Sequence, residues 1–260
     1  MLPDAIFVRV ILYSRSNDGW GERMGEKGST INARFIRSLS IGWEQVPENS
    51  YLRGILALTR LAELEFTHDI TIFTGENGAG KSTLLEAIAV AAGFNREGGT
   101  LNFMHSSYDD VSELHKALTL VRGFSRPKWG QYLRAESFYN VATLVVTEYA
   151  GGYRSLPDMH AQSHGESFLS FMRYAPERSL LILDEPEAAL SPRKQLELAS
   201  LIENHARNGS QFIIATQSPI ILGIQDAQIL SFDGGSVHEV DWGETDAVRV
   251  MRDYLAERLG

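Results

Sequence analysis

The hydrophobic positions along the chain follow two different periods. Short runs of consecutive or alternating apolar residues are typical of strands, and apolar residues spaced three and four apart are typical of helices. Leu84, Leu85, Ile88 and Ala91 keep the helical spacing until Gly93, a residue that commonly ends a helix. From residue 179 onward, strand and helix alternate regularly. This alternation indicates an α/β fold in which helices cover a mostly parallel sheet.

The expected elements cover most of the chain. Strands are predicted at Ala5–Leu12, Ala33–Ile41, His68–Thr74, Gln131–Arg134, Leu180–Leu183 and Gln211–Thr216, and a hairpin at Ile229–Val240. Helices are predicted at Leu84–Ala92, Asp110–Val121, Ser137–Glu148, Phe168–Met172, Pro192–Arg207 and Thr245–Leu259. Residues 51–64 are expected to form a short helix or an extended edge, and 14–32 and 151–165 loops. No repeat or linker divides the chain, so we expect one domain over residues 1–260.

The amino-acid composition excludes several classes of protein. The chain has 260 residues, no cysteine and a net charge of −9. The absence of cysteine excludes a disulfide scaffold, a thiolate zinc site and a cysteine nucleophile. No apolar run approaches the roughly 20 residues that a membrane span needs, and the first apolar stretch lacks the features of a signal peptide. We therefore expect a cytoplasmic protein without a transmembrane segment.

A phosphate-binding loop is the strongest motif. Residues 75–82 read Gly75, Glu76, Asn77, Gly78, Ala79, Gly80, Lys81, Ser82, which fits G-x-x-x-x-G-K-[ST] between a predicted strand and a predicted helix. The glycines let backbone N–H groups point at phosphates, and the helix N-terminus adds its positive dipole end. Lys81 is expected to reach the β- and γ-phosphates of ATP, and Ser82 to bind Mg²⁺, with Thr83 beside it.

A second motif ends in two carboxylates. The apolar run Leu180–Leu183 is followed by Asp184 and Glu185. Four apolar residues in a row suit a strand buried on both faces, and ligands bind at the carboxyl ends of such strands. Asp184 is expected to hold Mg²⁺ through water, and Glu185 to orient or deprotonate the attacking water.

Taken together, these motifs resemble those of the ABC-type ATPases, in particular the branch without transporter function that includes the SMC and DNA-repair ATPases. Asp184 and Glu185, followed by residues 186–192, resemble the second nucleotide motif and the D-loop of that family. Ser163, Gly165 and Glu166 lie in a variant of its Ser-Gly-Gly-Gln signature, before the strand as the family requires. The resemblance implies a P-loop NTPase fold with an antiparallel N-terminal β portion and a reduced helical subdomain at about 94–175.

The same resemblance implies how the site works. In the family, the signature of one protomer completes the site of the other, so two chains hold two ATP molecules head to tail. Ser163 and the Gly165 backbone stand where a predicted helix begins, which suits an anion. We therefore expect an ATP-dependent homodimer with ATP and Mg²⁺ as cofactors.

Two positions depart from the family pattern. Its Q-loop residue should follow the strand at Gln131–Arg134, and Glu136 is the preferred counterpart, as a metal ligand, with Gln131 second. Arg134 is either a phosphate contact or an ion-pair partner. Gln217 stands where the family has a switch histidine; its amide donates a hydrogen bond but carries neither proton nor charge. The resemblance therefore implies slow hydrolysis with ATP binding retained.

Three functions remain open at this stage. The first is an ATP-hydrolysing dimer switch that acts on a soluble protein or a nucleic acid. The second is an ATP sensor with negligible turnover because of Gln217. The third, the ATPase subunit of a membrane transporter, is weakened because residues 82–162 show a single convincing amphipathic helix. The same segment lacks sustained heptads, which excludes the long coiled coils of DNA-repair members.

Overall fold

The structure is a computed structural model that describes residues 34–96, 98–100, 113–134, 164–188 and 190–259. Its strands are β1 (Ile36–Ile41), β2 (Glu63–Glu65), β3 (Ile70–Thr74), β4 (Gly99–Thr100), β5 (Leu118–Arg122), β6 (Trp129–Arg134), β7 (Ser179–Asp184), β8 (Gln211–Ala215), β9 (Ala227–Ser231) and β10 (His238–Glu239). Its α-helices are α1 (Leu56–Thr59), α2 (Lys81–Ala92), α3 (Leu114–Ala117), α5 (His164–Tyr174), α6 (Pro192–Arg207), α7 (Pro219–Leu222) and α8 (Asp246–Leu259). The strands and helices of the predicted α/β fold are confirmed in their main features.

A seven-stranded sheet organises the fold, with the strand order β10-β9-β3-β8-β7-β6-β4. The five central strands are parallel, and β10 and β4 pair antiparallel at the two edges. The carboxyl ends of β3, β7, β8 and β9 therefore meet at one edge of this sheet. Strand β8 lies between the strand that leads into the phosphate-binding loop and the strand that ends at Asp184.

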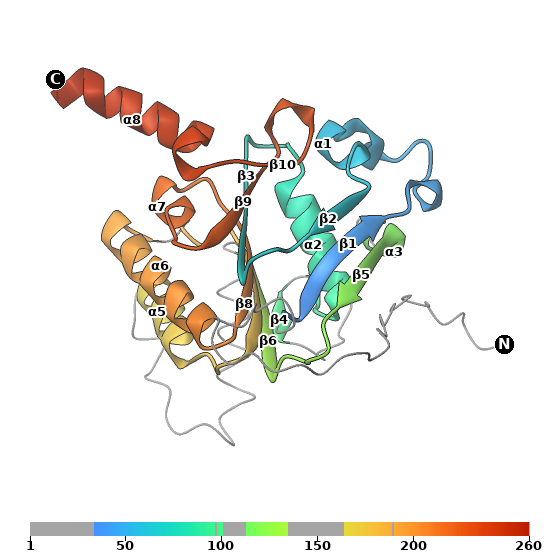
Figure 1. Ribbon diagram of the computed structural model, residues 1–260, viewed down its shortest axis with the longest axis horizontal. Coiled ribbons are helices and arrows are strands. Elements are labelled where there is room, and N and C mark those ends of the chain that lie inside the picture. The colour runs from blue at the N-terminus through green and yellow to red at the C-terminus, as the bar shows by residue number, and fades with distance from the viewer. Residues whose placement is uncertain (1–33, 97, 101–112, 135–163, 189, 260) are drawn as a thin grey trace, which may run out of the picture.

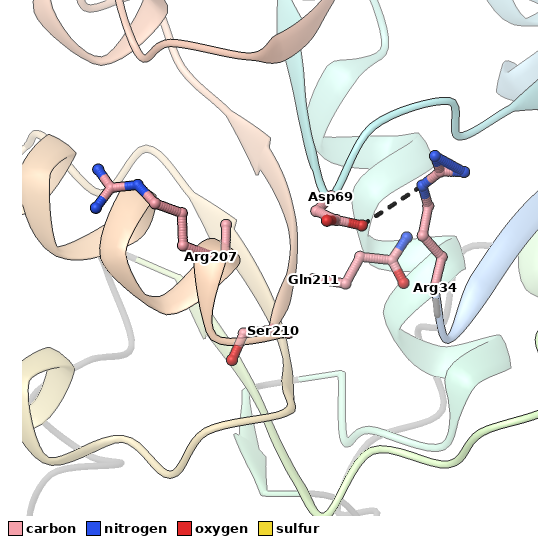
Figure 2. A pocket seen from close by; sticks show the side chains of 7 residues that line it. Arg34, Asp69, Arg207, Ser210 and Gln211 are labelled. Carbon is pink, nitrogen blue, oxygen red and sulfur yellow. Dashed lines mark ion pairs between the residues drawn. The ribbon is translucent and has the colours of Figure 1, made fainter. Parts of the chain in front are cut away.

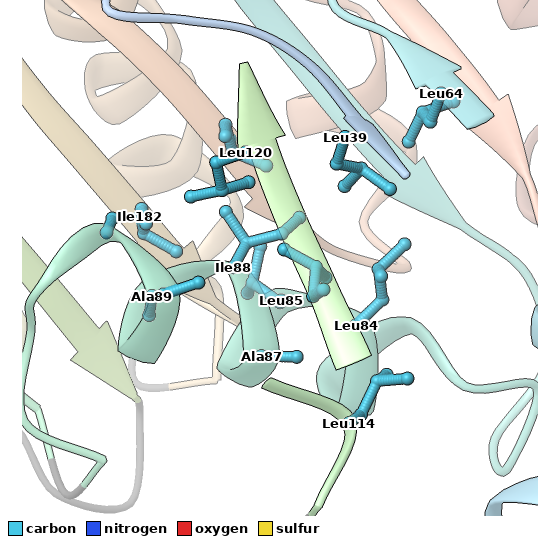
Figure 3. Close-up of a cluster of buried hydrophobic side chains, with 14 of the residues drawn as sticks. Leu39, Leu64, Leu84, Leu85, Ala87, Ile88, Ala89, Leu114, Leu120 and Ile182 are labelled. Carbon is cyan, nitrogen blue, oxygen red and sulfur yellow. The ribbon is translucent and has the colours of Figure 1, made fainter. Parts of the chain in front are cut away.

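A smaller antiparallel sheet, β2-β1-β5, supplies the predicted antiparallel β portion. Helix α2 packs between the two sheets, and the helices α5, α6 and α7 lie on the other face of the large sheet (Figure 1). In Figure 3, Leu84, Leu85 and Ile88 of α2 gather with side chains of β1, β5 and β7. A hydrophobic core lies on each face of the large sheet, and successive residues of its strands point to opposite faces. In β7, Leu180 and Ile182 face α2, whereas Leu181 and Leu183 face α6.

Several expectations from sequence need correction or lie outside the description. The helix predicted at 110–121 is wrong in its second half, because α3 stops at Ala117 and β5 follows. Leu118 and Leu120 are buried while Thr119 is half-buried, so this segment has the period of a strand and pairs with β1. Residues 51–64 contain a 3₁₀ turn (Tyr51–Gly54), α1 and β2. The strand predicted at 5–12 and the helix predicted at 137–148 lie outside the described residues.

The opposite, amino-terminal edge of the large sheet carries a cavity of about 250 Å³, shown in Figure 2. Arg34 and Asp69 form an ion pair there, with 3.6 Å between Nε and Oδ1. Beside it the buried side chain of Gln211 joins the two sheets: its Oε1 accepts the N–H groups of Phe35 and Ile36, each at 2.9 Å. This edge lies opposite the phosphate-binding loop and the pair Asp184 and Glu185, which stand at the carboxyl ends of β3 and β7.

Candidate functional site

The phosphate-binding motif forms the turn between β3 and α2. Gly78 and Gly80 have φ angles of +83° and +104°, which favour glycine and let the chain curl around the start of α2. The Lys81 side chain is buried, and its Nζ donates to the carbonyls of Gly75 at 2.6 Å and Glu76 at 2.8 Å. Glu76 and Asn77 are exposed at the tip of the turn, Ala79 is half-buried, and Thr83 is half-buried one residue after Ser82.

Burial lowers the pKa of Lys81 below the ordinary lysine value, and the neighbouring carboxylates Glu185, Asp233 and Asp184 oppose that shift. An ammonium group held between a buried turn and several carboxylates forms a compact positive charge. Such a charge is suited to anionic oxygens that enter the loop.

Ser82 and Asp184 come together from two different motifs. The Ser82 hydroxyl donates to Oδ1 of Asp184 at 2.9 Å, across 102 positions of sequence. Burial raises the pKa of Asp184, and the hydrogen bond from Ser82 and the charge of Arg134 oppose the rise. A hydroxyl and a carboxylate at this spacing are oxygen ligands of the kind that Mg²⁺ prefers, so the donor set fits the ion.

Glu185 and Gln217 flank this pair. Glu185 is exposed with φ at +50°, a backbone conformation that L-residues rarely adopt, and its N–H donates to the Ala215 carbonyl at 2.9 Å. Gln217 follows β8, and its side-chain amide donates to Oδ1 of Asn77 in the phosphate-binding loop. A strained carboxylate residue and a polar switch position at one sheet edge are typical of a functional site.

The expected signature and Q-loop residues are only partly within the description. Ser163 and Glu136 lie outside the described residues. Gly165 is buried in the first turn of α5, and Glu166 pairs with Lys194 of α6 at 3.7 Å. Gln131, the second choice for the Q-loop, does not reach the site: it is fully buried in β6 opposite Leu181, and its Nε2 donates to the carbonyl of Tyr132 at 3.4 Å.

Arg134 is an ion-pair partner in this structure. Its Nε lies 3.9 Å from Oδ2 of Asp184, and its Nη1 lies 3.5 Å from Glu86 of α2. Arg96 also pairs with Glu86, at 3.1 Å. These ion pairs connect the end of β6 to the residue that is expected to hold Mg²⁺. Of the two roles left open for Arg134, the geometry therefore supports the ion pair.

The sequence analysis missed two acidic residues at this edge. Asp233, which follows β9, accepts the N–H of Glu76 at 2.9 Å and so supports the phosphate-binding loop from behind. Glu187 accepts hydrogen bonds from Thr216 and from the backbone of Gln217. Asp233 stands in the hairpin turn and belongs to no motif. Glu187 lies within the segment that resembles the D-loop, where its position two residues after Glu185 was a usable signal.

Among the described residues, no group of three or more His, Asp or Glu side chains is arranged to hold a metal ion. None of the described helices is both long and apolar enough to cross a membrane.

This chain is similar to two family models and to a solved structure. A family model described as "AAA domain, putative AbiEii toxin, Type IV TA system" matches residues 168–223, and one described as "AAA domain" matches residues 51–115. A solved structure described as cbiO1 from Clostridium perfringens, part of the ABC transporter complex cbiONQ, is similar at 17% identity. Its TM-score is 0.47, with 86% of this chain and 94% of that chain covered.

Two curated relatives share the name cytochrome c biogenesis ATP-binding export protein CcmA. The protein of Rhizobium etli is 30% identical over 190 residues, which cover 66% of this chain and 86% of the relative. The protein of Rhizobium johnstonii is 29% identical over 216 residues, which cover 73% of this chain and 97% of the relative. With an identity of this level over most of the relative's length, and with the phosphate-binding loop in place between β3 and α2, the chain belongs to the ABC-type ATPases of the P-loop class.

Proposed function

We propose that this chain is a Mg²⁺-dependent ATP hydrolase that acts as an ATP-driven head-to-tail homodimer switch. One observation carries the proposal: the ends of β3, β7 and β8 bring Lys81, Ser82, Asp184, Glu185 and Gln217 to one sheet edge. These residues come from three separate segments of sequence. Their meeting supplies a positive charge, oxygen ligands for a cation and a carboxylate that can act on water.

Lys81 is the residue that changes partners when ATP enters. Its Nζ donates to two loop carbonyls, and an ammonium group can exchange these for phosphate oxygens without losing hydrogen bonds. The backbone N–H groups of the loop and the start of α2 add further donors. Ser82 and Asp184 would hold Mg²⁺, which neutralises charge on the phosphate oxygens when bound.

Glu185 is the proposed base, since its exposed carboxylate follows the strand that ends at Asp184. It would orient the attacking water and accept its proton. Gln217 would donate its side-chain amide to the γ-phosphate. Because glutamine carries no charge, it stabilises developing negative charge less than a protonated histidine would.

The homodimer is proposed on the resemblance of Ser163, Gly165 and Glu166 to the family signature. Support comes from α5, which begins at His164, so that Gly165 and Glu166 lie in the first turn of a helix. A second chain would place this terminus against the ATP held by the first. Each site would then need the other protomer, and the monomer is expected to hydrolyse ATP poorly.

The decisive experiment measures hydrolysis and oligomeric state together. Single-turnover hydrolysis of ATP is followed with Mg²⁺ and with EDTA, while light scattering reports the mass in solution. Glu185→Gln should accumulate an ATP-bound dimer, because it retains the binding residues and loses the base. Lys81→Ala is the control and should lose ATP binding. A Glu185→Gln monomer at saturating Mg-ATP would contradict the dimer, and tight ATP binding by Lys81→Ala would contradict the loop assignment.

An ATP sensor with negligible turnover is the second candidate. The hydrogen bond between Gln217 and Asn77 favours it, because that bond engages the side-chain amide with the phosphate-binding loop. The same assay separates the two functions: a dimer that forms with ATP but shows no single-turnover hydrolysis would identify the sensor. Adding DNA or RNA to the assay tests for a nucleic-acid partner through a change in rate.

The ATPase subunit of a membrane transporter is the third candidate. It is favoured because the curated relatives are named as ATP-binding export proteins. Affinity purification from detergent-treated membranes tests it. Recovery of an integral membrane protein would support this candidate, and recovery of proteins from the cytoplasmic fraction alone would exclude it.

A further inference from the structure

Glu187 joins two loops of the nucleotide edge. It lies between β7 and α6, and its Oε1 accepts the Thr216 hydroxyl at 2.6 Å and the Gln217 backbone N–H at 2.9 Å. Thr216 is completely buried, and Glu187 is half-buried. One carboxylate oxygen therefore holds the residues that follow β8 against the loop that follows β7.

The Gln217 side chain points from this held backbone toward the phosphate-binding loop. With its N–H held by Glu187, Gln217 extends its amide across to Asn77, in the turn between β3 and α2. Glu187, Gln217 and Asn77 thus connect the three loops at the carboxyl ends of β7, β8 and β3. A short chain of hydrogen bonds between packed loops restricts rotation of each member.

Further hydrogen bonds connect residues 216–218 to helix α6. The Thr216 hydroxyl accepts the N–H of Ser218 at 3.0 Å, and the Ser218 hydroxyl donates to Gln195 of α6 at 2.6 Å. Gln195 in turn donates to the carbonyl of Leu190 at 2.9 Å. Residues 216–218 are therefore attached to the loop after β7 directly at Glu187 and, through Gln195 of α6, at Leu190.

The other carboxylate oxygen of Glu187 is buried and has no hydrogen-bond partner among the described residues. Burying a carboxylate oxygen without a donor costs free energy, so Glu187 is kept at some cost to the stability of the fold. The negative charge of Glu187 is also one of those that oppose the lowered pKa of Lys81. A carboxylate at this cost, within the electrostatic field of Lys81, indicates a role in the site in addition to packing.

We propose that Glu187 is a positioning residue that acts through Gln217. It holds the Gln217 amide in the direction of the bound phosphate and couples the position of loop 185–190 to that amide. This inference rests on the proposed function, because it assigns Gln217 a contact with the γ-phosphate. Glu187 lies in the segment 186–192 that resembles the family's D-loop, so in the proposed dimer a shift of Glu187 would change the orientation of Gln217.

The test compares three variants in the full chain by single-turnover hydrolysis and by ATP titration. Glu187→Ala removes both hydrogen bonds and should lower the maximal rate about tenfold, with the Kd for ATP changed by less than about threefold. Glu187→Gln keeps an acceptor oxygen and should stay within about threefold of the natural rate. Glu187→Asp shortens the side chain by one methylene and should also lower the maximal rate. This variant provides the test if Glu187→Ala does not fold.

Glu203→Ala is the matched control. Its Oε1 also accepts a backbone N–H, that of Gln225 at 3.1 Å, but at the amino-terminal edge of the sheet. The loss of a carboxylate that accepts a loop N–H is the same in both variants, so a purely structural effect would appear in both. We expect the Glu203→Ala rate to equal that of the natural chain.

A double-mutant cycle decides whether Glu187 acts through Gln217. The variant with both Glu187→Ala and Gln217→Ala should be no slower than Gln217→Ala alone, because one interaction is removed in either case. The inference would be overturned if the effects of the two substitutions on the rate were additive. It would also be overturned if either Gln217→Ala or Glu187→Ala left the natural rate unchanged. Absence of hydrolysis by the natural chain would instead overturn the proposed function, and this inference with it.

Discussion

Replacing Gly80 with alanine should destabilise the protein more than the same replacement at Gly78. Both glycines have positive φ angles, so alanine at either position adopts a left-handed conformation that costs about 1 kcal/mol after the entropy change of the unfolded chain is included. The space around them differs. A Cβ at Gly78 would meet no atom within 4 Å, whereas a Cβ at Gly80 would lie 2.6 Å from Cγ2 of Ile55 and 3.1 Å from Cγ of Leu58.

Leu58 is fully buried, so it cannot turn out to solvent to make room. Forcing a methyl group into a packed site costs about 1–3 kcal/mol. The expected losses are therefore about 1 kcal/mol for Gly78→Ala and about 2–4 kcal/mol for Gly80→Ala. The excess measures how closely α1 packs against the loop that is proposed to bind phosphate.

Urea unfolding of the nucleotide-free proteins, followed by circular dichroism, gives the two free-energy changes from the midpoint shifts. The reasoning also predicts coupling: Ile55→Ala should cost less in the Gly80→Ala background than in the natural chain, because it removes the clashing methyl group. The packing argument would be refuted if the two glycine variants lost the same free energy of unfolding within about 0.5 kcal/mol. Additive effects of Ile55→Ala and Gly80→Ala on that free energy would refute it as well.

Two further substitutions test the electrostatics of the site. Because burial raises the pKa of Asp184, the stability linked to its protonated form is present at low pH and is lost as the pH rises through the raised pKa. Asp184→Asn should therefore unfold at a higher urea concentration than the natural chain at about pH 7, and the difference should shrink as the pH is lowered. The same variant should bind Mg-ATP more weakly, and lower stability at about pH 7 would contradict the burial argument. Gln217→His should raise the single-turnover rate about tenfold because histidine can carry a proton and a positive charge, and an unchanged or lower rate would count against the proposed role of residue 217.

Local pattern was sufficient for the elements of the large sheet that carry the motifs. The apolar runs that became β3, β7 and β8 and the helical spacing of α2 and α6 agree with the structure because each of these segments is buried with its own regular period. The pattern failed at 110–121, where a single turn of helix is followed at once by β5. That strand is determined by its pairing with β1, about 80 residues earlier in sequence, and no window along the sequence contains both partners.

For the site, the sequence alone determined the chemistry of the phosphate-binding loop and of Asp184 and Glu185, because fixed residue types at fixed spacing are needed to wrap a phosphate and to end a buried strand in carboxylates. Only the tertiary structure decided which groups meet. The order of the parallel strands places Ser82 against Asp184, Asp233 behind Glu76, and Glu187 beneath Gln217. These contacts join segments up to 157 positions apart, and such distances are bridged by the parallel sheet, which brings the carboxyl ends of its strands to one edge.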